Sequence, residues 1–100
     1  MFNLVENDDD FEIKINGDLT IYNAIETHTY FSELECQQNK KYTLNCEDIN
    51  NIDTSGLQLL VAFKNKVISN QALFELKNIE SEVLSKINLL NLKSELFITE

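Results

Sequence analysis

Residues 52–60 read Ile-Asp-Thr-Ser-Gly-Leu-Gln-Leu-Leu, and they carry the strongest local structural signal in the chain. Asp, Thr and Ser side chains accept hydrogen bonds from the N–H groups left free at a helix start, and an apolar run at helical spacing follows them. The stretch predicts a loop over Asp53 to Gly56 that leads into a helix, with Ser55 at or near its start. Ser55 and Gln58 have the spacing of a capping box, and Gly56 allows another backbone or a partner to approach closely. Taken alone, the pattern also fits a well-capped helix start with no further function.

Hydrophobic periodicity elsewhere predicts alternating strands and helices. Apolar residues alternate with polar ones in the expected strands and recur every three or four residues in the expected helices. The expected strands are Phe2–Val5 at an edge, Phe11–Ile15, Leu19–Ile21 after a turn at residues 16–18, Tyr42–Cys46 before a polar turn at residues 47–51, and Ala72–Leu76. The expected helices begin near Asn23, Ser55 and Asn78, and residues 92–98 add a short final helix or strand.

From Phe11 on, the order β, β, α, β, α, β, α predicts an α/β fold with a mostly parallel β-sheet covered by α-helices, in one domain over residues 1–100. Asn23 and Asn78 are expected to cap their helices, and Lys64 and Lys66 to face solvent. Either Thr27 or His28 is expected to join Phe31 on a buried helix face, and Leu90 to lie on the buried side of the last helix.

Functional loops in such sheets gather at the carboxyl ends of the strands. The Asp53–Gly56 loop follows the expected Tyr42–Cys46 strand. We expect the Gly17–Tyr22 segment to lie near it, which would bring Asp18, Thr20 and Asn23 towards one site.

The net charge of −9 and the absence of Arg argue against nucleic acid as a partner, because a binder needs cations against the phosphates. An anionic membrane surface would be repelled for the same reason, and no apolar run is long enough to insert into a bilayer. The charge suits a basic protein surface, although solubility explains it equally well. Without features of a secretory signal, we expect a cytoplasmic protein whose Cys36 and Cys46 are reduced thiols; whether they form a disulfide stays open at this point.

Catalytic motifs are missing from the sequence. There is no phosphate-binding glycine loop, no HExxH and no Cys/His cluster, so we expect no metal and no cofactor. His28 is the sole histidine and is more simply a surface or packed residue than a catalytic one. We therefore expect a protein that is not an enzyme.

At Asp53–Leu57 the sequence resembles the STAS domain family, which includes the anti-sigma-factor antagonists and the related sulphate-transporter domains. Residues 17–24 are similar to the family's strand-to-helix segment, and residues 42–46 with 52–53 are similar to its central strand and signature loop. Residues 83–87 fit its late helix.

The resemblance implies a switch that works by protein binding. Ser55, just before the signature glycine, corresponds to the serine that a partner kinase, itself the anti-sigma factor, phosphorylates; a phosphatase resets the switch. The unphosphorylated form binds the partner. The implied partner-binding residues are Asp18, Thr20, Asn23, Asp53, Thr54, Ser55, Gly56 and Leu57.

Two positions depart from the antagonist pattern. Thr54 stands where antagonists commonly have Ser, and Thr20 where they often have Asp. Thr54 is therefore a competing phosphoacceptor, and the chain looks closer to small stand-alone STAS proteins found with chemotaxis or other signalling systems. Two alternatives stay open: a non-enzymatic subunit of a phospholipid-transport ABC complex, and a nucleotide or small-molecule pocket beside Asp18, Thr20 and Ser55.

Overall fold

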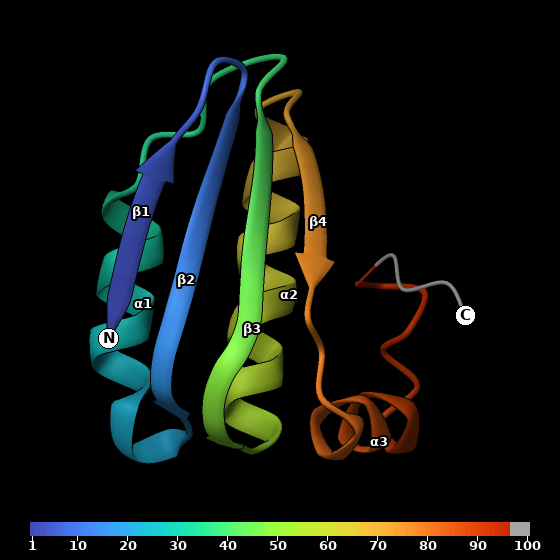
Figure 1. The fold of residues 1–100 in the computed structure, drawn as a ribbon. Helices are drawn as coiled ribbons and strands as arrows, with labels where there is room; N and C mark the ends of the chain where they lie inside the picture. The colour runs from blue at the N-terminus through green and yellow to red at the C-terminus, as the bar shows by residue number, and fades with distance from the viewer. Residues whose placement is uncertain (97–100) are drawn as a thin grey trace.

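The computed structural model describes residues 1–96 of the protein. Within these residues, four strands and three α-helices follow one another, with a short 3-10 helix between the second strand and the first α-helix (Figure 1). They are β1 (Phe2–Glu6), β2 (Asp10–Leu19), η1 (Ile21–Asn23), α1 (Ala24–Glu33), β3 (Lys41–Ile52), α2 (Thr54–Ser69), β4 (Leu73–Lys77) and α3 (Ser81–Leu89).

The strands form one sheet in the order β1-β2-β3-β4. β1 is antiparallel to β2, whereas β2, β3 and β4 are parallel. α1 and α2 cover one face of this sheet, and α3 lies beyond the carboxyl end of β4 (Figure 1). The α/β fold with a mostly parallel sheet is thus confirmed, and the helix starts lie at the carboxyl edge of the parallel strands.

β3 is longer than its alternating pattern indicates, because it contains two irregularities in its register with β2. The pairing shifts between Lys14 and Asn16 and again between Gly17 and Asp18. Each extra residue in β3 turns the following side chains to the other face, so Cys46, Ile49 and Ile52 are all buried on the helix side. The predicted polar turn at residues 47–51 is therefore strand.

β2 is also continuous where a break was predicted. Residues 16–18 lie inside it, and Gly17, with a φ of 122°, provides backbone freedom there. Leu19 is the end of this strand and not the start of a new one. Ile21 belongs to η1.

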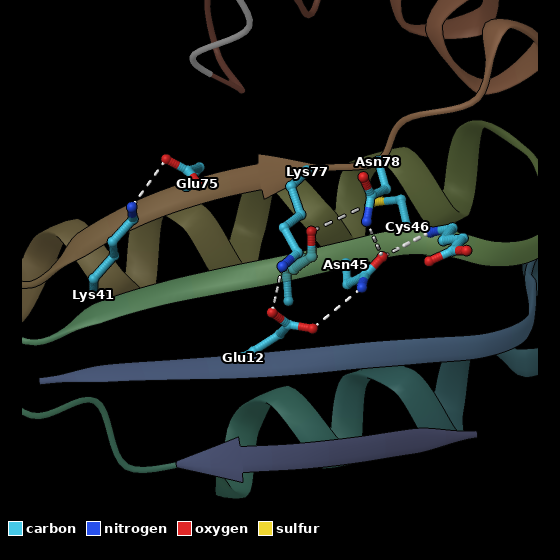
Figure 2. Close-up of polar contacts among 9 residues, drawn as sticks. Glu12, Lys41, Asn45, Cys46, Glu75, Lys77 and Asn78 are labelled. Carbon is cyan, nitrogen blue, oxygen red and sulfur yellow. Dashed lines mark hydrogen bonds and ion pairs between the residues drawn. The ribbon is translucent and has the colours of Figure 1, made fainter. Parts of the chain in front are cut away.

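The other face of the sheet is polar, and its side chains form hydrogen bonds and ion pairs with one another (Figure 2). At its centre Asn45 Nδ2 donates to Glu12 (3.2 Å), and Asn45 Oδ1 accepts from the Glu47 N–H (3.1 Å) and from Asn78 Nδ2 (3.2 Å). Lys77 pairs with Glu12 at 2.6 Å. The hydrogen bonds from Lys77 and then Asn45 lower the pKa of the Glu12 carboxyl. Asn78 thus joins this network and does not cap α3, whose N-cap position is Glu80.

Several helix predictions also needed correction. The Asn23 side chain does not cap α1. Of the two candidates left open for the buried face of α1, Thr27 joins Phe31 there and His28 is exposed, so the expectation is confirmed for Thr27. Lys64 is buried rather than solvent-facing, with its ammonium 3.3 Å from Glu95. The long stem of lysine lets apolar atoms be buried while the charge finds a partner at the rim.

The remaining predictions concern the end of the chain and the cysteines. Leu90 is 40% exposed, so it is not part of the buried side of α3. Residues 93–96 form turns, and residues 97–98 of the predicted final element lie outside the described part. Cys36 and Cys46 are free thiols. Within residues 1–96, every helix is too short or too polar to cross a membrane.

Candidate functional site

Asp53 joins the two loops at the carboxyl edge of the sheet. It is the N-cap of α2, and its carboxylate accepts from the Gly56 N–H at 3.0 Å. The other carboxylate oxygen accepts from the Ile21 N–H at 2.9 Å, and the Asp53 N–H donates to Leu19 O at 3.1 Å. One side chain therefore holds the start of α2 against the connection between β2 and α1, as the sequence predicted for these two segments.

The surrounding backbone N–H groups stabilise the charged form of Asp53. Burial alone would raise the pKa of this carboxyl, but the N–H groups of Gly56, Ile21 and Ser55 outweigh burial and lower the pKa. Asp53, and not Ser55, is the cap of α2, so the capping box expected between Ser55 and Gln58 is not the device that starts the helix.

Gly56 allows the first turn of α2 to lie against the end of β2. A Cβ at this position would overlap Leu19 O and stand 2.9 Å from Leu19 Cβ, and an atom cannot fit there. The predicted close approach at Gly56 is thus made by the domain's own backbone. Gly56 is buried and offers no surface to a partner.

Thr54 and Ser55 face different hollows on the two sides of the helix start. Ser55 is half-buried and borders a hollow of about 400 Å³ between α1 and α2. Thr54 is exposed and borders a hollow of about 290 Å³ on the side of α3. The first hollow is lined by Ile21, Ala24, Ile25, His28, Ser55, Gln58 and Leu59, and the second by Ile52, Asp53, Thr54, Leu57, Lys86, Leu89 and Leu90.

Exposed apolar side chains lie at the Ser55 hollow: Ile21 and Ile25 line it, and Tyr22 follows Ile21 in η1. Ile21 is 59% exposed, Tyr22 94% and Ile25 85%. They lie in η1 and the first turn of α1, directly beside the loop that Asp53 anchors. Such a group of exposed apolar residues is typical of a surface that binds another protein.

Two other predicted site residues, Thr20 and Asp18, form hydrogen bonds with neighbouring side chains of the domain. Thr20 Oγ1 donates to Asn23 Oδ1 at 3.0 Å, and Asp18 accepts from Asn51 Nδ2 at 3.1 Å. Leu57 is fully buried, so it belongs to the core and cannot contact a partner docked on the folded domain.

The sequence reasoning missed the apolar residues around Ser55, above all Ile21, Tyr22 and Ile25. A signal was present for Ile25, because it falls outside the face of α1 that carries Thr27 and Phe31. It also missed Lys86, whose ammonium donates to Ile52 O at 2.7 Å and so holds α3 against the end of β3. Residues 1–96 contain no group of His, Cys, Asp and Glu side chains that could hold a metal ion.

Comparison with known proteins agrees with this fold. A family model, the STAS domain, matches residues 1–100. No curated protein sequence matches the chain. Among solved structures, a candidate anti-sigma factor antagonist from Thermotoga maritima is 25% identical with a TM-score of 0.77, covering 93% of this chain and 80% of that one.

Two further structures share the fold at lower identity. The anti-sigma factor antagonist SpoIIAA in its unphosphorylated form has a TM-score of 0.65 at 14% identity, over 89% of this chain and 83% of that one. A sulfate transporter family protein from Wolinella succinogenes has a TM-score of 0.75 at 17% identity, over 92% and 75%. A longer protein, Mglu, matches over 79% of this chain with a TM-score of 0.66 at 15% identity, but the chain spans only 20% of its length.

Proposed function

The chain belongs to the STAS domain family, and from that premise we propose that it is a non-enzymatic regulator that binds a protein partner at the start of α2 and is switched by phosphorylation of Ser55. One observation carries this proposal. Ser55 lies in the first turn of α2 at the edge of an apolar hollow that the exposed side chains of Ile21 and Ile25 also line.

The switch follows from charge and shape. A phosphate would add nearly two negative charges to Ser55, and the helix start can tolerate it within the domain. A partner seated on the hollow would instead meet a bulky dianion on an apolar surface. A change of about 3 kcal/mol in binding free energy weakens binding about a hundredfold. The fold itself does not have to move.

The partner class is taken from the family resemblance. The candidate anti-sigma factor antagonist from Thermotoga maritima and SpoIIAA suggest a serine kinase that is also an anti-sigma factor, or a similar regulator, with a phosphatase to reset the switch. The net charge of −9 favours a basic surface on that partner. We place this exchange in the cytoplasm, where kinases and their ATP are found.

The test begins with the mass of the protein from its native cell. We expect a species heavier by one phosphate, and its fragments should place the phosphate on Ser55. A phosphate on Thr54 instead, or none under any growth condition, would contradict the proposal.

Binding is then compared between variants in pull-downs from the same cells. Ser55→Asp should recover far less of the partner than wild type, while Ser55→Ala should recover it fully. Ser69→Asp is the matched control, because it adds the same charge at the exposed far end of α2. Equal recovery by Ser55→Asp and Ser69→Asp would count against a switch at Ser55.

A second candidate function rests on the hollow at Thr54. This hollow is bordered by the exposed Leu89 and Leu90, and the protein shares its fold with a sulfate transporter family protein. In this alternative the domain is a subunit of a membrane transport complex of the phospholipid-transport ABC type. Co-purification of a permease and an ATPase, lost in Thr54→Arg but not in Ser55→Arg, would support it over the switch.

A further inference from the structure

His28 borders the same hollow as Ser55. It lies on α1, whereas Ser55 lies on α2, and the other residues that line the hollow carry no charge. His28 is also the sole histidine of the chain. A phosphate on Ser55 would therefore find one ionisable side chain across an otherwise uncharged hollow.

The helix geometry brings the imidazole towards Ser55. α1 and α2 both start at the carboxyl edge of the sheet and run in the same direction (Figure 1). His28 is four residues after Ala24, so its backbone lies about 6 Å further from the edge. Side chains on a helix lean towards its N-terminus, which carries the imidazole back over the turn that faces Ser55.

The ring is free to make this contact at little cost. Its Nε2 lies 3.5 Å from Ser32 Oγ, which is long for a hydrogen bond and exposed to solvent. Exchanging this contact for one with a phosphate replaces a weak neutral interaction by a charge-assisted hydrogen bond, which is roughly twice as strong as a neutral one.

We infer that His28 is a positioning residue that holds the phosphate of phosphorylated Ser55 within the hollow between α1 and α2; this inference rests on the proposed function. The held phosphate lies across Ile25 and Leu59 and covers the apolar surface that a partner would use. Phosphorylation then closes the hollow and does not only repel the partner.

Two charged side chains near His28, Lys66 and Glu26, do not compete with this pairing. On α2, Lys66 lines the neighbouring hollow, but the carbonyls of Phe31, Ser32 and Leu34 hold its ammonium. On α1, Glu26 is two residues before His28, a spacing at which side chains do not face each other. The pairing needs the imidazolium and the phosphate dianion together, so it is weakened by acid, which protonates the phosphate, and by base, which deprotonates the ring.

The test uses phosphoserine inserted at position 55 during translation, so that it does not depend on any kinase. The ring protons of the single histidine are followed by NMR through a pH titration. We expect their midpoint to rise by about one pH unit relative to the unmodified protein. Phosphoserine at position 54 is the matched control, because Thr54 faces the other hollow, and its shift should stay below about a third of that value. Equal shifts from the two positions, or no shift from position 55, would overturn the inference.

A second measurement observes the phosphate itself. In the protein with phosphoserine 55, the ³¹P signal should titrate at a lower pH than in the same protein carrying His28→Asn, because the imidazolium favours the dianion. Identical ³¹P titrations would overturn the inference even if the ring protons respond. Neither NMR result tests the proposed switch, which the mass analysis and the pull-downs decide. The role of His28 and the switch at Ser55 can therefore fail separately.

Discussion

At the scale of single residues, Asp53 and Gly56 hold the candidate site together in complementary ways. Asp53 accepts backbone hydrogen bonds from Ile21 and Gly56, which belong to two different segments. Gly56 leaves the space that the Leu19 carbonyl occupies. The position of Ser55 depends on both residues, since it lies between them in the sequence.

Gly56→Ala should destabilise the domain by about 3 kcal/mol, because the new methyl group meets backbone atoms that cannot rotate away. Urea unfolding monitored by circular dichroism measures this change. Ser55→Ala in the same helical turn is the control and should change the unfolding free energy by less than about 0.5 kcal/mol. A Gly56→Ala variant as stable as the control would mean that α2 and β2 can move apart without cost.

Asp53→Asn should lower the unfolding free energy by about 1 kcal/mol at pH 7, since the variant keeps an oxygen acceptor but loses the charge. The pKa of Asp53 is lowered in the folded protein, so its stabilisation is present above the ordinary carboxyl pKa and is lost as the pH falls through the folded one. The difference from wild type should therefore shrink at about pH 3. Asp9→Asn, at an 87% exposed side chain, is the control, and urea unfolding at both pH values is the measurement.

At the scale of elements, lysines join the helices to their neighbours. Lys66 on α2 donates to the carbonyls of Phe31, Ser32 and Leu34 at the end of α1. Lys86 on α3 donates to Ile52 O at the end of β3. The last carbonyls of a helix lack partners within it and attract a cation, so Lys66 ties the two helices that border the Ser55 hollow.

Lys66→Met should destabilise the domain by about 2 kcal/mol, because three carbonyls lose a charged donor while the apolar stem is retained. Lys41→Met is the control: Lys41 makes an exposed ion pair with Glu75 at 3.1 Å, which should be worth less than about 1 kcal/mol. Thermal unfolding of the two variants beside wild type decides the matter, and equal losses would show that the Lys66 contacts add nothing beyond a surface ion pair.

At the scale of the whole molecule, the two faces of the sheet have different tasks. The helix-covered face contains the apolar core. The face without helices carries polar pairs such as Glu12 with Lys77 (Figure 2). The exposed apolar residues of the β2–α1 connection lie instead at the carboxyl edge, beside Ser55. The candidate binding surface is therefore an edge of the domain and not its open face.

The excess of acidic residues, 17 Asp and Glu against 8 Lys, should make the domain more stable in salt. Screening weakens the mutual repulsion of the acidic groups more than it weakens a few exposed ion pairs. Raising NaCl from about 10 mM to about 150 mM should raise the Tm by about 4 °C, equivalent to about 1 kcal/mol. A lower Tm in salt would mean that the ion pairs outweigh the repulsion; the same series in sucrose controls for effects unrelated to charge.

The sequence by itself determined the family, the mostly parallel sheet and the helix start at residues 53–56. These features rest on local signals: the period of apolar residues, a run of side chains that accept hydrogen bonds, and a glycine next to them. The close approach at Gly56 and the meeting of the two loops were also predicted in this way.

The tertiary structure alone decided which of the three polar residues caps α2, where β2 and β3 end, and that Lys64 is buried. It also placed Ser55 and Thr54 beside different hollows and placed His28 at the same hollow as Ser55. Each of these features depends on contacts between residues far apart in the sequence, such as Lys64 with Glu95. Periodicity and capping preferences describe neighbours along the chain, so they carry no information about such contacts.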